Sequence, residues 1–67
     1  MKSIYLLTNI DSGIHTAHGT LTGVMNCIEE GSGPVYTDID FIDTRLKRVG
    51  QVTIEEGWSI EVVSYDE

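Results

Sequence analysis

Residues 21–42, LTGVMNCIEEGSGPVYTDIDFI, decide the fold class of this chain. In the first part of the stretch, apolar side chains recur at the i, i+3, i+4 and i+7 positions of an amphipathic helix, namely Leu21, Val24, Met25 and Ile28. We therefore predict a helix over residues 21–30, with Thr20 as its N-cap and Gly31 just past its end. Residues 31–34, which contain two glycines and a proline, then break the chain.

The second part of the stretch alternates between two sets of side chains, as a half-buried strand does. One set is Val35, Thr37, Ile39 and Phe41, and the other is Tyr36, Asp38, Asp40 and Ile42. We predict a strand over residues 35–42, followed by a turn at residues 43–44. Residues 45–49 are expected to form a further strand, with a single helical turn as the alternative.

Strands are also predicted on both sides of this stretch. Residues 3–8 are rich in β-branched and aromatic side chains and are typical of a strand. Residues 14–18 form either a short return strand or an ordered loop. Near the C-terminus, residues 51–55 and 58–65 alternate on either side of Glu56-Gly57, which indicates a hairpin.

These elements together predict a single α+β domain over residues 1–67. One helix packs on an antiparallel sheet of four or five strands, in a β(β)αβββ meander. The chain is short enough for only one domain, and its 40% of hydrophobic residues suffice for one thin core. We place Trp58 in that core, in line with Ile60 and Val62 on one face of the last strand. Because small cores are often completed by a second copy, a homodimer is one arrangement that we consider.

The charge balance limits the partners of the chain. Eleven acidic residues stand against four basic ones, which gives a formal net charge of −7. Direct binding to nucleic acid is not expected, because affinity for a phosphate backbone comes from Lys and Arg. The charge points instead to a basic protein partner or to a soluble, self-repelling module.

Other features of the sequence bear on where the protein is found. The N-terminal residues MKSIYLLTN hold an apolar run that is too short for a signal peptide. No stretch approaches the roughly 20 apolar residues of a membrane span. The single cysteine, Cys27, excludes an intrachain disulfide. We expect a cytoplasmic protein that begins at its own Met1 and does not enter a membrane.

Candidate catalytic and metal-binding residues are few. The residue types that bind zinc include Asp11, His15, His18 and Cys27. Their spacing matches no zinc motif, and the two histidines share a face only if residues 14–18 are helical. Cys27 with either histidine lacks an orienting third group, and the chain leaves little room for a substrate pocket. We expect no catalytic residue, no metal and no cofactor, with metal binding through the two histidines as a minor alternative.

Carboxylates recur along the predicted sheet and its turns. Asp38 and Asp40 lie on one face of the predicted strand, about 6.6 Å apart along it. Such an array can occupy a groove built for phosphates, and the alternative is a solvated face that hinders aggregation. The candidate partner-binding residues are the carboxylates Asp38, Asp40, Asp43, Glu55, Glu56 and Glu61, with Tyr36 and Tyr65 as less polar anchors.

Three of the four basic residues, Arg45, Lys47 and Arg48, fall within four positions. Three cations in a field of −7 are a weak footprint for nucleic acid. We expect them to form ion pairs with the neighbouring aspartates instead.

In size and charge, the chain resembles phage-encoded inhibitors of host enzymes, including anti-CRISPR proteins and nucleic-acid mimics. The resemblance rests on no shared motif. It implies a small non-enzymatic protein in the host cytoplasm that blocks the basic, nucleic-acid-binding surface of a host defence or nucleic-acid-processing enzyme. The alternative is a homo-oligomeric structural or accessory subunit with no inhibitory role.

Overall fold

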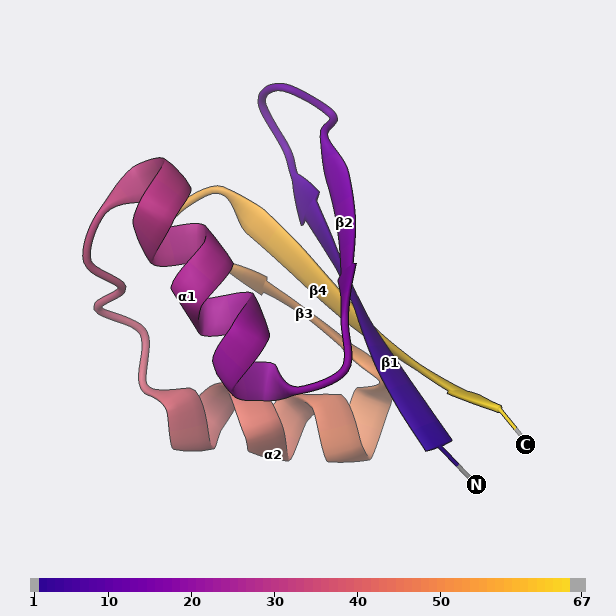
Figure 1. Cartoon of the computed structure of the whole chain (residues 1–67). Helices are drawn as coiled ribbons and strands as arrows, with labels where there is room; N and C mark the ends of the chain where they lie inside the picture. The colour runs from indigo at the N-terminus through magenta and orange to yellow at the C-terminus, as the bar shows by residue number, and fades with distance from the viewer. Residues whose placement is uncertain (1, 66–67) are drawn as a thin grey trace.

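The structure is a computed structural model that describes residues 2–65, with Tyr65 described by its backbone alone. In this part of the chain the elements are β1 (Lys2–Asn9), β2 (His15–His18), α1 (Leu21–Ser32), α2 (Ile39–Val49), β3 (Gln51–Ile54) and β4 (Trp58–Tyr65). The strands form one antiparallel sheet, and both helices cover the same face of it (Figure 1). The predicted α+β class, with helical packing on an antiparallel sheet, is confirmed, and the structure adds a second helix.

The strand order in the sheet is β2-β1-β4-β3. β1 and β2 form one hairpin, and β3 and β4 form another. The two central strands join these hairpins along their whole length, from Lys2 opposite Tyr65 to Asn9 opposite Trp58. The first and last strands are therefore neighbours, so the sheet is not the simple meander that the sequence predicts.

Apolar side chains fill the space between the sheet and the helices. At the centre of this core Leu7 lies opposite Ile60, and neither side chain is exposed. Trp58 is only 6% exposed, which confirms its predicted place in the core. The buried members are Leu7, Val24, Ile28, Ile42, Leu46, Val52, Ile54, Trp58 and Ile60.

α1 forms where the sequence predicts a helix, because its cap and its apolar stripe agree. The Thr20 hydroxyl accepts a hydrogen bond from the Gly23 backbone N–H at 3.1 Å, which satisfies one of the free donors at the helix start. Val24 and Ile28 lie one turn apart and are fully buried against the sheet.

The end of α1 differs from the prediction. The helix continues to Ser32, and Gly33 rather than Gly31 ends it, with a φ of 84° that favours glycine. Gly31 lies against Trp58, where a Cβ would stand 3.3 Å from the indole ring. The glycine at this residue therefore permits close packing of α1 on β4.

The prediction of strands over residues 35–42 and 45–49 is wrong, because residues 39–49 form α2. The alternation of the sequence overlaps a helical spacing in which Ile42 and Leu46 lie four residues apart. Both side chains are buried, as expected for one face of a helix. In a strand, Phe41 and Ile42 would instead point to opposite faces of the sheet. Phe41 is 52% exposed.

Capping residues fix the two ends of α2. The Asp38 carboxylate accepts a hydrogen bond from the Asp40 backbone N–H at 3.0 Å, and Gly50 ends the helix with a φ of 88°. Asp40 lies in the first turn, and Lys47 and Arg48 lie in the last turn. All three charges are favourable to the helix dipole, so local electrostatics also select a helix here.

The hairpin around Glu56-Gly57 is confirmed, with Gly57 at a φ of 90° and its N–H donating to the Ile54 carbonyl at 3.1 Å. Residues 15–18 form a strand, which decides between the two alternatives for this segment. Within residues 2–65, neither helix is long and apolar enough to cross a membrane.

Adjacent residues in α2 offer a direct test of this helix. Ile42→Ala should lower the free energy of unfolding by about 2–5 kcal/mol, because it leaves a cavity in the core. Phe41→Ala should cost about 1 kcal/mol, because that side chain is already half in water. Urea denaturation of both variants measures the difference, and equal losses would contradict the helical assignment.

Candidate functional site

The turn between β3 and β4 holds the linker that joins the two helices. The Tyr36 backbone N–H donates to one Glu56 carboxylate oxygen at 2.7 Å, and the Thr37 hydroxyl donates to the other at 2.9 Å. These two hydrogen bonds, the one from Tyr36 first, lower the pKa of Glu56. The carboxylate is therefore kept ionised and fixed in orientation at the surface.

A surface depression lies beside this turn. It has a volume of about 400 Å³ and is lined by Tyr36, Thr37, Phe41, Thr53, Ile54 and Glu55. Tyr36 is 87% exposed although its backbone is held by Glu56. An aromatic side chain on an anchored backbone, next to carboxylates, is typical of a protein-binding surface.

The C-terminus of α1 adds two more carboxylates to this end of the molecule. Glu29 and Glu30 are exposed near the end of the helix, and its last turn holds no basic residue. Negative charge is unfavourable there, because the helix dipole places partial negative charge at the C-terminus. The position of these glutamates therefore does not serve the stability of α1.

Two contacts place the end of α1 next to the β3–β4 turn. Trp58 directly follows the turn. Its indole N–H donates to the Ser32 hydroxyl at 2.8 Å, and the same ring packs on Gly31. Figure 1 shows the end of α1 beside the start of β4. We call the carboxylates of these segments the acidic end, which consists of Glu29 and Glu30 at the end of α1, Glu55 and Glu56 in the turn, and Asp38, which directly follows the linker residues that Glu56 binds.

Two of the three cations of α2 lie away from the acidic end. Lys47 and Arg48 are in the last turn of α2, whereas Asp38 caps its first turn. Lys47 forms an ion pair with Asp43 at 3.0 Å, which confirms the expected pairing for one of the basic residues. This exposed pair contributes little to stability but leaves Asp43 partly neutralised.

The predicted partner-binding residues are thus only partly brought together. Tyr36, Glu55 and Glu56 surround one turn, and Asp38 follows two residues after Tyr36. Asp38 and Asp40 do not share a strand face, because they cap and begin α2, and the expectation that Tyr36 shares a face with Ile42 is wrong, because Ile42 is buried.

Four predicted residues do not join this group, and the first of them, Asp40, lies in the first turn of α2. Asp43 lies on the side of α2 that faces Tyr5, away from Phe41. Glu61 lies on the face of the sheet that the helices leave open, opposite Leu6. The side chain of Tyr65 is outside the described residues.

Sequence reasoning did not select Glu29 and Glu30. The signal for them was present, because a Glu-Glu pair at the end of a predicted helix, with no Lys or Arg nearby, opposes the helix dipole. The missing information was spatial, since only the tertiary structure places these residues beside the β3–β4 turn.

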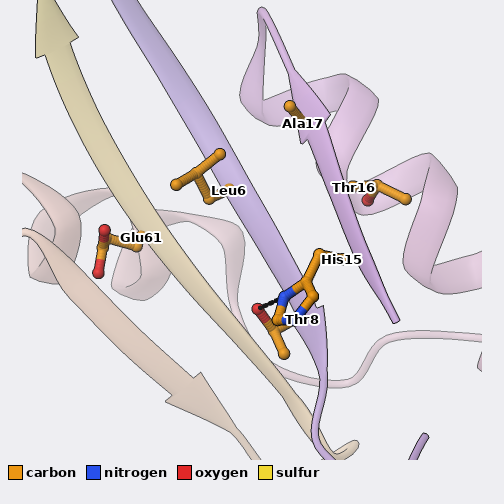
Figure 2. A pocket seen from close by; sticks show the side chains of 6 residues that line it. All are labelled: Leu6, Thr8, His15, Thr16, Ala17 and Glu61. Carbon is orange, nitrogen blue, oxygen red and sulfur yellow. Dashed lines mark hydrogen bonds between the residues drawn. The ribbon is translucent and has the colours of Figure 1, made fainter. Parts of the chain in front are cut away.

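A second depression, of about 380 Å³, lies on the open face of the sheet (Figure 2). Its floor is Leu6, which lies between Ala17 on β2 and Glu61 on β4. The His15 ring and the Thr8 hydroxyl are joined by a hydrogen bond of 3.0 Å, and the ring does not reach Glu61. The histidine and the carboxylate therefore form no catalytic pair.

The strand assignment of residues 15–18 also decides the question of a shared metal ligand set. His15 contacts Thr8 on the open face, whereas His18 contacts Thr16 at 2.9 Å on the helix side of the sheet. The two imidazoles point to opposite faces and cannot bind one ion. Among residues 2–65, no group of three or more His, Cys, Asp and Glu side chains is arranged to hold a metal.

Comparisons of the chain with protein-family models, with curated protein sequences and with solved structures find no match.

The hydrogen bonds of Glu56 predict a pH dependence of stability. A carboxyl whose folded-state pKa is lowered stabilises the fold above its unfolded pKa of about 4.3 and loses this contribution as the pH falls through the folded-state value. Glu56→Gln should therefore reduce the loss of stability between about pH 5 and about pH 3. Urea denaturation at each pH measures this, with Glu55→Gln as the matched control from the same turn. An equal effect of both variants would contradict the role of the linker contacts.

The charges at the end of α1 predict that a substitution will stabilise the protein. Glu30→Lys should raise the free energy of unfolding by about 0.3–1 kcal/mol, because a cation is favourable at a helix C-terminus. Glu61→Lys makes the same charge change on the open sheet face and should alter stability by less than about 0.5 kcal/mol. Thermal denaturation at low ionic strength compares the two, and a loss of stability in Glu30→Lys would refute this account.

Proposed function

We propose that this protein is a small, non-enzymatic binding protein that presents its acidic end to a basic surface of a protein partner and blocks it. The partner is expected to be a nucleic-acid-binding protein. The Lys and Arg side chains that such a protein uses to contact phosphates could pair with the carboxylates of the acidic end instead. The protein would then act as an inhibitor of the phage-encoded, nucleic-acid-mimic or anti-CRISPR kind. It would need no catalytic group and no cofactor.

The observation that carries this proposal is the placement of Glu29 and Glu30. They lie in the one part of α1 where negative charge is unfavourable, and this end of the helix is attached through Ser32 to Trp58, two residues after Glu56. By contrast, every charge in the first and last turns of α2 favours the helix dipole. Charges that oppose stability and gather in one place are typical of a surface retained for binding.

The geometry of the β3–β4 turn supports the same proposal. The linker contacts fix the Glu56 carboxylate before any partner arrives, so less side-chain entropy is lost on binding. Tyr36 adds a large exposed aromatic surface at the edge of the acidic end. Carboxylates would steer and orient a basic partner, and the tyrosine would provide an apolar anchor.

The mechanism that follows is steric and electrostatic occlusion. Carboxylates of the acidic end would pair with Lys and Arg side chains of the partner, and the body of the domain would cover the nucleic-acid path. Complementary charge of this kind accelerates association and makes it sensitive to salt. The residues that we assign to this contact are Tyr36, Asp38, Glu55 and Glu56, together with Glu29 and Glu30.

The test is capture of partners by the immobilised protein from a cell lysate at about 0.1 M and about 1 M salt, over which the Debye length falls from about 10 Å to about 3 Å. A basic nucleic-acid-binding protein should be held at low salt and released by high salt or by added double-stranded DNA. The combined variant Glu30→Lys with Glu55→Lys should lose the captured protein while staying folded.

Glu61→Lys is the control for position, because it reverses one carboxylate on the open face of the sheet, and it is matched in charge to each single reversal, Glu30→Lys or Glu55→Lys. It should retain most of the captured protein. If capture survives the double reversal but not Glu61→Lys, the acidic end is not the binding surface. If nothing basic is held at low salt, the proposed function fails.

A further inference from the structure

β3 is an edge strand whose outer side is not paired with any strand in residues 2–65. The Val62 N–H donates to the Gly50 carbonyl at 2.9 Å, so residues 50 and 62 form a hydrogen-bonded pair. Such pairs alternate along an antiparallel ladder, and the register therefore turns the N–H and C=O groups of Gln51 and Thr53 outward. β3 also lacks the Lys, Pro or bulge that commonly protects an exposed edge.

α2 forms one wall of a groove along this edge. Phe41, Arg45 and Val49 are successive members of one helical row, spaced four residues apart. A depression of about 280 Å³ lies between this row and residues 51–53, and it shares Phe41 and Thr53 with the depression of about 400 Å³ beside Glu55. Phe41 and Val49 are 52% and 58% exposed. An unprotected strand edge thus lies beside apolar side chains that are in contact with water.

We propose that two copies of this chain associate through β3, in antiparallel pairing about a two-fold axis at Thr53. The Thr53 N–H of each copy would donate to the Thr53 carbonyl of the other. Gln51 would then lie opposite Glu55 of the second copy, and Val52 opposite Ile54. The product is a continuous sheet with all of the helices on one face. Strands from other chains are known to add to exposed sheet edges in this way.

The charges in the groove select this register. Arg45 lines the groove beside residues 51–53, and Glu55 lines it at the other side of Thr53. With the axis at Thr53, residues 51–53 face residues 53–55 of the second copy, so each Arg45 meets the other copy's Glu55. An axis at Val52 would instead place the two Arg45 side chains against each other, which is unfavourable.

The apolar side chains and the long-range charges fit the same arrangement. Phe41 borders both depressions beside Thr53, so the axis would bring the two Phe41 rings together and remove them from water. Antiparallel pairing also points the two β3–β4 turns in opposite directions, so the Glu55 side chains of the two copies, which meet Arg45, do not meet each other. The repulsion between two chains of net charge −7 is thereby reduced at the interface.

The pairing is tested on the protein alone by sedimentation equilibrium between about 10 µM and about 1 mM. The expected result is a mass that rises from the 7.4 kDa of one chain towards twice that value. Thr53→Pro should abolish the rise, because it removes an outward N–H but no hydrogen bond within the sheet. Circular dichroism and a melting curve check that the variant is folded.

Ala17→Pro is the matched control on the opposite edge of the sheet. Residues 9 and 14 form a hydrogen-bonded pair, so the alternation turns the Ala17 N–H outward from β2 as well. Ala17→Pro should leave the dimer intact. A dimer that survives Thr53→Pro, or that is lost only in Ala17→Pro, would overturn the proposal.

A charge exchange tests the register. Arg45→Glu and Glu55→Arg should each weaken the dimer about tenfold, because each turns two attractive contacts into two repulsive ones. The double variant Arg45→Glu with Glu55→Arg should restore the dissociation constant to within about threefold of the original. If both single variants weaken the dimer and the double variant does not recover, the axis at Thr53 is wrong. A chain that remains monomeric at about 1 mM overturns the proposal altogether, and it leaves the proposed binding of a basic partner unaffected.

Discussion

The antiparallel pairing of β1 with β4 is the interaction on which the rest of the structure depends. It joins the first and last strands of the chain over eight pairs of residues and is the only strand pairing in residues 2–65 that connects the two hairpins. Its centre, Leu7 opposite Ile60, is also the centre of the core on which both helices pack. Neither hairpin alone would cover its apolar face, since a two-stranded hairpin is marginally stable in water.

This pairing also positions the acidic end. The Ile10 N–H donates to the Gly57 carbonyl at 3.0 Å, so the ladder between the central strands carries over into the β3–β4 turn. The turn in turn holds the helix linker through Glu56, and Trp58 holds the end of α1. The pairing of β1 with β4 therefore positions segments that carry carboxylates and are distant in the sequence. The contacts of the core offset the repulsion between these carboxylates.

Local signals in the sequence predicted the strands at both ends of the chain, the hairpin at Glu56-Gly57 and the start of α1. The segment from Val35 to Val49 was assigned to strands because two periodicities coincide there. Ile39, Phe41 and Asp40 alternate as in a strand, while Ile42 and Leu46 lie four residues apart as in a helix. The capping signals of Asp38 and Gly50, and the charges of Asp40, Lys47 and Arg48, favour the helix and would have decided correctly.

The candidate site was predictable only in part, for a different reason. Glu55, Glu56 and Tyr36 follow from composition and turn chemistry, but their association depends on a hydrogen bond across 20 positions of sequence. The place of Glu61 on the open face depends on the strand register, which local pattern does not specify. The groove beside β3 could likewise not be predicted from the sequence, because α2, which forms one of its walls, was expected to be strands.

The contact between Trp58 and the end of α1 makes tryptophan fluorescence a measure of whether α1 is packed on the sheet. Trp58 is the single tryptophan of the chain, its indole is 6% exposed, and its N–H is bound to the Ser32 hydroxyl. Fluorescence that is excited at wavelengths which the three tyrosines do not absorb therefore arises from one ring at the junction between α1 and β4. Separation of α1 from the sheet would expose this ring to water and shift its emission to longer wavelengths, whereas an event confined to the open face of the sheet would leave the spectrum unchanged.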